Sequence, residues 1–363
     1  MAQAPPPGPQ PGDPVIFSKF DGMKNTVQSE RLGPHDLLTA TNVTLDDTGQ
    51  LSRRRGSTLQ VSGNAHSLFT SAQGDITLVV LNGDLVILNK DYSTYDLATE
   101  ISTDPSQGLP GLAYAQVGRK VYFSSPTDRG VVDLDGQVVG VWGSGEDYWL
   151  SPVVNPTATL PAVAGRLLRQ PPNATVLCYF NGRIYLAQGK TMWATVLYAY
   201  NFVDTTAGYK QFEGVITMIG AVGDGIYVGT DEGLYFLSGS SYDTLKKVRV
   251  MDSGVIPGSM VTIPSELGNP PQESLGADTP LQVSIAFMTT NGFCAAQDGG
   301  QVYNLTETKF FFPQASSAAS MYRRQDGMNQ FVTTMQSGGD PTNNAAIGDF
   351  IEGTIIRASA LTN

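Results

Sequence analysis

One pattern recurs six times along this 363-residue chain and limits what the chain can fold into. In each copy, a short apolar segment is followed by a glycine-containing turn and then by a second apolar segment. Asn-Gly or Asp-Gly between alternating apolar residues is the strongest local signal for a β-hairpin, because a type I′ turn needs positive φ at both central positions. The pattern therefore predicts an all-β protein.

The spacing of the copies indicates how the hairpins are organised. Five copies carry Asn-Gly or Asp-Gly, and the sixth is predicted to have a looser turn. The turn glycines are Gly83, Gly118, Gly182, Gly225, Gly292 and Gly327, separated by 35, 64, 43, 67 and 35 residues. A repeat of about 40–50 residues is typical of a β-propeller, in which each blade is a four-stranded sheet. The shorter steps match one blade, and the longer ones carry loop insertions near residues 151–173 and 255–280.

Two segments, Leu78 to Leu81 and Ile226 to Val228, are almost continuously apolar. Strands that are buried on both faces have this composition, and the strands between neighbouring propeller blades are buried in this way. The sequence therefore predicts a single β-propeller domain over residues 15–363, with six blades favoured over five or seven. A two-sheet sandwich, or a pair of barrels built from the same hairpins, is the alternative.

The N-terminal part of the chain differs from the repeats. Residues 1–14 are rich in proline and are predicted to form an extended arm. A short helix is predicted from Pro34 to Thr41, because proline suits the first helical turn and two leucines follow it. Residues 42–53 are predicted to form a hairpin. We expect this hairpin and the segment from Gly348 onward to close the ring, because an open ring leaves edge strands exposed.

Composition bears on which partners the protein has. The chain has 22 basic and 33 acidic residues, a net charge of −11, which argues against a nucleic-acid clamp but not against a channel through which DNA passes. Charged residues make up 15% of the chain, against about 25% in ordinary soluble domains, and this favours a surface covered by partner proteins. No signal-peptide pattern and no run of about 18 apolar residues is found, so we expect folding in a cytoplasm and no membrane span.

The residue types that carry chemistry are sparse. The two histidines, His35 and His66, match no metal-binding spacing, and the two cysteines form no disulfide framework. The carboxylate pairs Glu146-Asp147 and Asp231-Glu232 lie beside turns, where we expect them to cap backbone amides. No phosphate-binding loop or dinucleotide fingerprint is present. We therefore predict a protein without catalytic residues, cofactor or metal.

Three consecutive arginines, Arg53, Arg54 and Arg55, stand out in a chain so poor in charge. Successive residues of a strand point to opposite faces, so at least one arginine is expected to lie in a contact. We interpret them as an interface that pairs with carboxylates across blades or across a subunit boundary. The alternatives are a solvated edge strand protected by its charge and, third, a patch that contacts DNA.

The run FSKFDGMKNTVQSERLGPHDLLTATNVTLDDTGQLSRRRGS, which begins at Phe17, resembles the opening of a family of phage virion proteins. The shared features are Ala-x-Asn-Val followed by Gly-x-Leu-x-Arg-Arg-x-Gly. Residues 66–69, 112–124 and 226–239 are similar to the propeller strands of the same family. These are the tail nozzle, or tail tubular B-type, proteins of short-tailed bacteriophages.

This resemblance implies a propeller subunit that forms a ring, with six copies favoured, around the channel for DNA ejection. It further implies docking of an adaptor ring and tail fibres, and a location in the virion tail after synthesis in the cytoplasm of the host bacterium. The chain is short for this family, which leaves either a minimal nozzle or a component of a long tail's tip or baseplate.

Two other functions stay open. One is a receptor- or carbohydrate-binding propeller, which would place Tyr148, Trp149 and Trp193 in an exposed pocket. The other is a glycan hydrolase, which requires two carboxylates about 5–9 Å apart across a cleft.

Overall fold

The computed structural model describes residues 19–45, 48–54, 56, 58–105, 109–143, 168–263, 283–307, 309, 315–325, 328–337 and 351–357. The predicted arm, Arg55, Gly327 and most of the two insertions lie outside these residues. The described part is all-β. Its helical turns are three short 3-10 segments, η1 (Ser29–Arg31), η4 (Tyr242–Thr244) and η6 (Asp298–Gly300).

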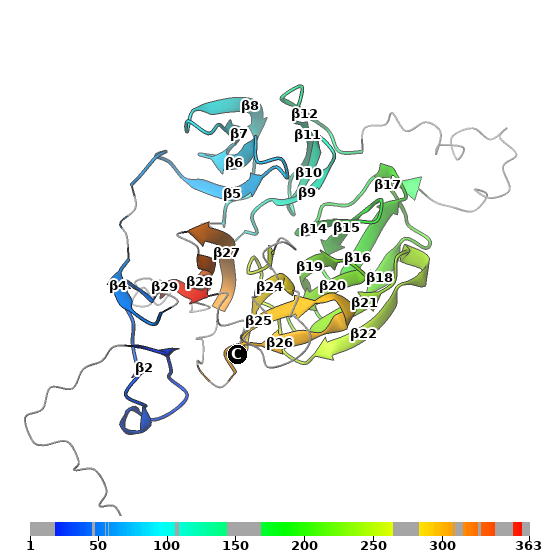
Figure 1. The fold of residues 1–363 in the computed structure, drawn as a ribbon. Coiled ribbons are helices and arrows are strands. Elements are labelled where there is room, and N and C mark those ends of the chain that lie inside the picture. The colour runs from blue at the N-terminus through cyan, green and yellow to red at the C-terminus, as the bar shows by residue number, and fades with distance from the viewer. Residues whose placement is uncertain are drawn as a thin grey trace, which may run out of the picture.

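Most of the described strands form six antiparallel sheets that follow one another in chain order (Figure 1). The first sheet contains β5 (Ala65–Thr70), β6 (Thr77–Leu81), β7 (Asp84–Leu88) and β8 (Thr94–Glu100). The second contains β9 (Ala113–Val117), β10 (Lys120–Ser124), β11 (Arg129–Asp133) and β12 (Val138–Gly140). The third contains β13 (Leu168–Arg169), β14 (Val176–Phe180), β15 (Arg183–Gln188), β16 (Thr191–Val196), β17 (Ala199–Asp204) and β18 (Tyr209–Gln211).

The remaining three sheets continue this order. The fourth contains β19 (Ile216–Val222), β20 (Gly225–Thr230), β21 (Leu234–Ser238) and β22 (Lys246–Met251). The fifth contains β23 (Val261–Thr262), β24 (Val283–Thr289), β25 (Gly292–Gln297) and β26 (Val302–Asn304). The sixth contains β27 (Ala315–Gln325), β28 (Met328–Ser337) and β29 (Ile351–Arg357).

Each predicted hairpin is present, and each lies in a different sheet. Asn82-Gly83 and Asn181-Gly182 form the two-residue turns that were predicted, with positive φ at both central positions. Gly118 was expected in a looser turn, but Val117 pairs with Lys120, so this turn also has two residues, and Gly118 takes a φ of 59°.

Two of the glycines lie one position beyond the turn that they were predicted to form. Val222 pairs with Gly225, so Gly225 is the first residue of β20 and the turn consists of Gly223 and Asp224. Thr289 pairs with Gly292, so Gly292 is the first residue of β25 and the turn consists of Thr290 and Asn291. The hairpins are therefore correct while the turn positions shift by one.

Five separate apolar clusters hold the six sheets together, one between each consecutive pair. The first and second sheets share a cluster that includes Leu78 and Val121, and the second and third share one around Trp142. The other three clusters join the third to the fourth, the fourth to the fifth, and the fifth to the sixth sheet. This chain of face-to-face contacts is typical of propeller blades and differs from the single core of a two-sheet sandwich.

Strand β15 illustrates why these segments are so apolar. Ile184 and Leu186 belong to the cluster shared with the second sheet, whereas Tyr185 and Ala187 belong to the cluster shared with the fourth. Successive side chains of a strand point to opposite faces, so a strand between two neighbours buries residues on both faces, as β15 does from Ile184 to Ala187. The predicted apolar run at Ile226 to Val228 is likewise fully buried in β20.

The helix predicted at Pro34 to Thr41 is wrong. Strand β2 (Asp36–Leu37) lies there and pairs in parallel with β1 (Gly22–Met23). The backbone hydrogen bonds run from Asp21 N to His35 O and from Lys24 N to Leu37 O. Pairing with a neighbouring segment thus satisfies the backbone of a stretch with too few apolar residues to bury a helix face.

The hairpin predicted at residues 42–53 is confirmed as β3 (Val43–Leu45) paired with β4 (Leu51–Arg53). These two strands form a sheet of their own, and β29 pairs with β28, so in the described residues they do not join one blade as predicted. Figure 1 places β2 and β4 beside the six sheets rather than among them.

Candidate functional site

The arginine cluster lies at the end of this N-terminal hairpin. Arg53 is the last residue of β4, and Arg54 follows it with its backbone N–H donating to Asn42 O at 3.0 Å. Both residues are exposed. The strand therefore ends before it can place three arginines on alternating faces, and the predicted pairing with carboxylates stays a prediction. Arg55 lies outside the described residues.

The histidines and carboxylates singled out by sequence make local contacts. His35 Nδ1 lies 2.8 Å from Lys19 O, and His66 Nδ1 lies 2.7 Å from Ser67 Oγ. Burial lowers the pKa of His66. Asp231 Oδ1 accepts the backbone N–H of Val215 at 2.7 Å, which is the amide capping that its place beside a turn predicted. Glu146 and Asp147 lie outside the described residues.

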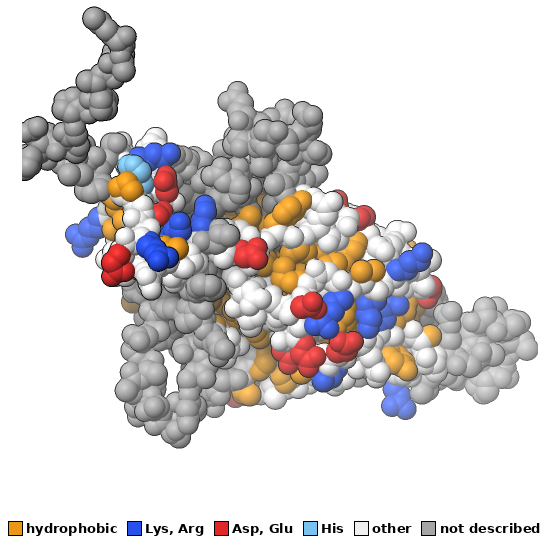
Figure 2. All heavy atoms as spheres, turned by 90° about the horizontal axis from the view of Figure 1, so that it is seen from below, with side chains coloured by type: hydrophobic (Ala, Val, Ile, Leu, Met, Phe, Trp, Pro, Cys, Tyr) orange, Lys and Arg blue, Asp and Glu red, His pale blue; other side chains and the backbone are white. Residues whose placement is uncertain are grey.

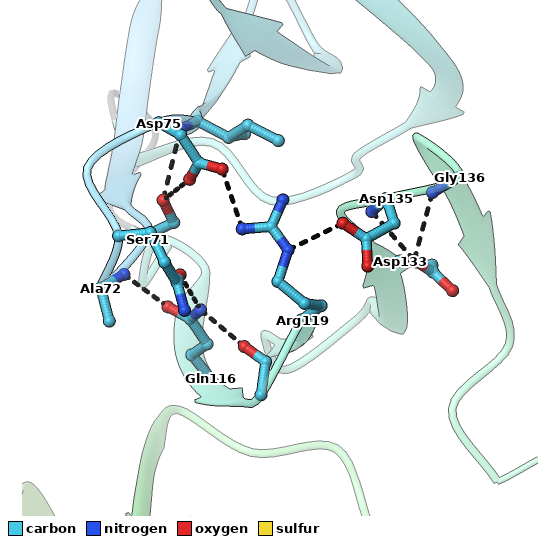
Figure 3. A network of polar contacts seen from close by, with 11 residues as sticks. Ser71, Ala72, Asp75, Gln116, Arg119, Asp133, Asp135 and Gly136 are labelled. Carbon is cyan, nitrogen blue, oxygen red and sulfur yellow. Dashed lines mark hydrogen bonds and ion pairs between the residues drawn. The ribbon is translucent and has the colours of Figure 1, made fainter.

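A polar network joins the first and second sheets at one edge (Figure 3). Arg119 donates from Nη1 to Asp75 and from Nε to Asp135, each at 2.8 Å, so it bridges a loop of the first sheet and a turn of the second. Ser71 and Arg119 both hydrogen-bond Asp75 and hold the pKa of its carboxyl below the usual value. Arg119 is half-buried and its two carboxylate partners are exposed, so we interpret the network as a structural contact between the two sheets.

A hollow in the described part of the surface lies where three connections meet. The Asn181-Gly182 turn of the third sheet, the β16–β17 turn of the same sheet and the β21–β22 connection of the fourth sheet surround a hollow of about 490 Å³. This volume falls within the range of about 300–1,000 Å³ that is usual for small-molecule sites. We call it the tyrosine hollow. The residues that line it include Tyr179, Asn181, Arg183, Tyr198, Ser241 and Tyr242.

Backbone contacts fix the rim of the tyrosine hollow. Asn181 Nδ2 donates to Ser240 O at 3.0 Å, which ties the two sheets together, and Tyr198 N donates to Gly182 O at 2.9 Å. Tyr198 has a φ of 57°, a backbone conformation that residues other than glycine rarely adopt. Its side chain is 66% exposed. A Cβ on Gly182 would lie 2.7 Å from the Tyr198 ring, so only glycine leaves room for that ring. The fold therefore holds an exposed aromatic in a strained backbone position.

The inner wall of the hollow is aromatic and carries positive charge. Tyr242 is 6% exposed, and its ring lies 5.6 Å from Arg183 Cζ and 4.8 Å from Lys210 Nζ. Burial raises the pKa of Tyr242, and its buried hydroxyl has no hydrogen-bond partner among the described residues. Leaving such a group unsatisfied costs about 1–3 kcal/mol.

The carbohydrate-binding alternative would place Trp193 in an exposed pocket, but Trp193 does not line the tyrosine hollow. Trp193 is half-buried in β16 and packs against Tyr209 with ring centroids 5.4 Å apart. Tyr148 and Trp149 lie outside the described residues. Sequence reasoning identified Asn181-Gly182 as a turn but missed the hollow, because the positive φ of Tyr198 and the approach of the fourth sheet leave no local signal.

The charges on the face seen in Figure 2 are mixed in sign, with Lys and Arg side chains beside Asp and Glu side chains and hydrophobic ones between them. Arg249, on β22, forms ion pairs with Glu213 at 3.1 Å and Asp252 at 2.8 Å. In the described part of the chain, no group of three or more His, Cys, Asp or Glu residues is placed to hold a metal ion. No described helix has the length and apolar character needed to cross a membrane.

The sequence matches no protein-family model and no curated protein. Among solved structures, the chain is similar to PorZ of the type-IX secretion system of Porphyromonas gingivalis, with 10% identity and a TM-score of 0.41 over 75% of this chain and 31% of that one. It is also similar to a structure of BBS1N in complex with ARL6DN (9%, TM-score 0.44, 82% and 84%) and to Kluyveromyces lactis Hsv2 (9%, 0.40, 80% and 86%). The chain spans less than two thirds of PorZ. Similarity at this level says nothing about what the chain does.

Proposed function

We propose that the chain is a six-bladed β-propeller subunit of a bacteriophage tail, a structural protein of the nozzle or tip through which DNA is ejected. In this proposal identical copies form a ring, with six copies favoured, and the ring docks an adaptor and tail fibres. The protein acts by shape and contact and carries out no reaction.

The observation that carries the propeller part of the proposal is the series of five apolar clusters. Each cluster joins one sheet to the next in chain order, so every inner sheet has neighbours on both faces. A sixth contact, between the last sheet and the first, would close the ring of blades. Val79 and Val86 pair across β6 and β7 and are buried outside these clusters, on the face of the first sheet that such a contact would cover.

The tail part of the proposal is supported by the N-terminal segment. The residues that resemble the virion family, with Arg53 and Arg54 among them, form a hairpin that pairs with no sheet of the propeller in the described residues. Arg53 and Arg54 are exposed and positively charged, on a protein whose net charge is −11. In this proposal the two arginines contact carboxylates of a neighbouring copy, and head-to-tail contacts of this kind generate a closed ring when the rotation between copies closes.

Electron microscopy and mass measurement of the purified full chain test this proposal. The expected result is a closed ring of identical copies with a central opening wide enough for duplex DNA. A monodisperse monomer at every concentration, or a particle without rotational symmetry, would overturn it.

A further inference from the structure

We infer that the tyrosine hollow binds a carboxylated sugar of an acidic glycan. This inference rests on the hollow alone and does not depend on ring assembly or on a phage tail. The ligand class follows from the kinds of side chain that converge there.

The sugar part of the assignment rests on the aromatic rings and the neutral polar groups. Tyr198 lines the hollow and is 66% exposed, so it presents part of its ring to a ligand. Tyr179 pairs with Ile184, which packs towards the second sheet, so the Tyr179 side chain lies on the opposite face of the third sheet from Arg183. Sugar rings have apolar faces that pack on such aromatics while their hydroxyls need hydrogen-bond partners at the edge. Asn181 and Ser241 also line the hollow and can donate and accept.

The acidic part of the assignment rests on Arg183. It carries the one charge among the described side chains that line the hollow, and Nη1 donates to Thr195 O at 2.6 Å. This bond orients a guanidinium that has five N–H donors in a planar fork, and such a fork matches a carboxylate. Lys210 Nζ lies 4.8 Å from the centroid of the Tyr242 ring, but Lys210 does not line the hollow.

Two carboxylates, those of Asp243 and Asp204, lie near enough to Tyr242 to act on it electrostatically. Asp243 and Asp204 both raise the pKa of Tyr242, while Arg183 lowers it. The surroundings of the hollow therefore include negative as well as positive groups. A simple anion reaches the Arg183 fork but has no ring to pack on Tyr198, and this difference favours an acidic sugar.

Calorimetric titration of the full chain with matched sugar pairs tests the inference. The probes are 3′-sialyllactose against lactose, and a galacturonic acid trimer against a galactose trimer, so that each pair differs in its carboxylates. We expect saturable binding of at least one acidic probe. We also expect binding at least about tenfold weaker for its neutral counterpart, since a charge-assisted hydrogen bond is lost.

Two variants with matched controls place the ligand. Arg183→Gln should weaken acidic-sugar binding by about tenfold or more, and Tyr198→Asn by about two- to tenfold. Asparagine is chosen because it tolerates the positive φ at that position. The controls are Arg169→Gln in the same sheet and Tyr92→Asn, since Tyr92 is also an exposed tyrosine with positive φ, at 65°.

The inference fails if neither acidic probe binds saturably, if the neutral sugars bind equally well, or if inorganic phosphate displaces the acidic sugar at similar concentration. It also fails if Arg183→Gln and Tyr198→Asn bind like their controls. Thermal unfolding of each variant separates lost binding from lost folding. A ring that forms without binding sugars would overturn this inference and leave the proposed function standing.

Discussion

At the scale of single residues, Gly118 and Gly225 both stand between two apolar segments of a predicted hairpin, but each position needs glycine for a different physical reason. Gly118 takes a φ of 59° with open space where a Cβ would stand. Gly225 has no positive φ, but a Cβ there would meet Leu237 O and would lie 2.8 Å from the Phe236 ring. One glycine is required by its backbone conformation and the other by the close approach of a neighbouring strand.

Substitutions at these two glycines should separate the two reasons. We expect Gly118→Ala to lower the free energy of unfolding by about 1–2 kcal/mol through its backbone conformation, and Gly225→Ala to lower it by about 2–3 kcal/mol through overpacking. Asparagine tolerates positive φ, so Gly118→Asn should be milder than Gly118→Ala, while Gly225→Asn should be more severe than Gly225→Ala. Urea denaturation measures all four, and the same order at both positions would contradict this account.

Cys294 gives a second prediction at this scale. Burial raises the pKa of this thiol to about 12 from 9.0, and the side chain is fully buried. Because the folded state holds the proton more tightly, this group favours folding below about pH 9 and loses that contribution as the pH rises from 9 towards 12. In a Cys178→Ser variant, iodoacetamide at pH 9 should modify the unfolded chain and spare the native one. Equal rates in the two states would show that Cys294 is accessible.

At the scale of elements, hydrogen bonds between sheets supplement the apolar clusters. Tyr227 is fully buried in the fourth sheet, and its hydroxyl donates to Gln297 O at 2.6 Å or to Gln301 O at 3.1 Å. Gln297 is the last residue of β25, and Gln301 lies in the connection from β25 to β26 of the fifth sheet. Nearby, Gly223 N donates to Asp298 Oδ1, and Gly299 N donates to Asp224 Oδ2, both at 2.9 Å. These hydrogen bonds join the fourth sheet to the fifth at a single edge.

Removing the Tyr227 hydroxyl tests the importance of this lock. Tyr227→Phe should lower the free energy of unfolding by about 1–2 kcal/mol, because buried hydrogen bonds are lost while the ring still packs. Tyr303→Phe is the matched control, since that hydroxyl is on an exposed side chain and donates to Gln301 Oε1. Its effect should stay within about 0.5 kcal/mol. If both variants unfold alike in urea, the fourth and fifth sheets do not depend on the Tyr227 contact.

Elements were predictable from the sequence where the signal is local. The six hairpins and the apolar strands follow from two-residue periodicity and Asn-Gly turns, and the structure has all of them. The segment from Pro34 to Thr41 was mispredicted because β2 depends on pairing with β1, which is distant in sequence. The tyrosine hollow depends on contacts between Asn181 and the fourth sheet, which no periodicity encodes. Local chemistry thus predicts the elements, while contacts between distant segments decide the site.

At the scale of the whole molecule, six sheets in sequence order account for the length of the chain and the spacing of its hairpins. The N-terminal hairpin lies outside this arrangement and carries an exposed arginine pair. In the proposed function, that hairpin contacts a neighbouring copy. In that proposal, folding depends on the apolar clusters between the sheets and assembly depends on the exposed arginines of the hairpin, so different residues serve the two.

Charge reversal at the hairpin tests that separation. The double substitution Arg53→Glu with Arg54→Glu should abolish ring formation while leaving the free energy of unfolding within about 0.5 kcal/mol, because both positions are exposed. Lys246→Glu is the control, an exposed cation on β22 that should leave the ring intact. Mass photometry gives the distribution of assemblies. Rings in the double variant, or equal loss in the control, would remove the hairpin from the interface.

The central claim is that the six sheets stand as consecutive blades around one axis. A cryo-electron microscopy reconstruction of the purified full chain, at a resolution that separates strands, tests it most directly. The account predicts six radial sheets in chain order, with the last packed against the first over Val79 and Val86. Two sheets stacked face to face over one shared core would contradict it.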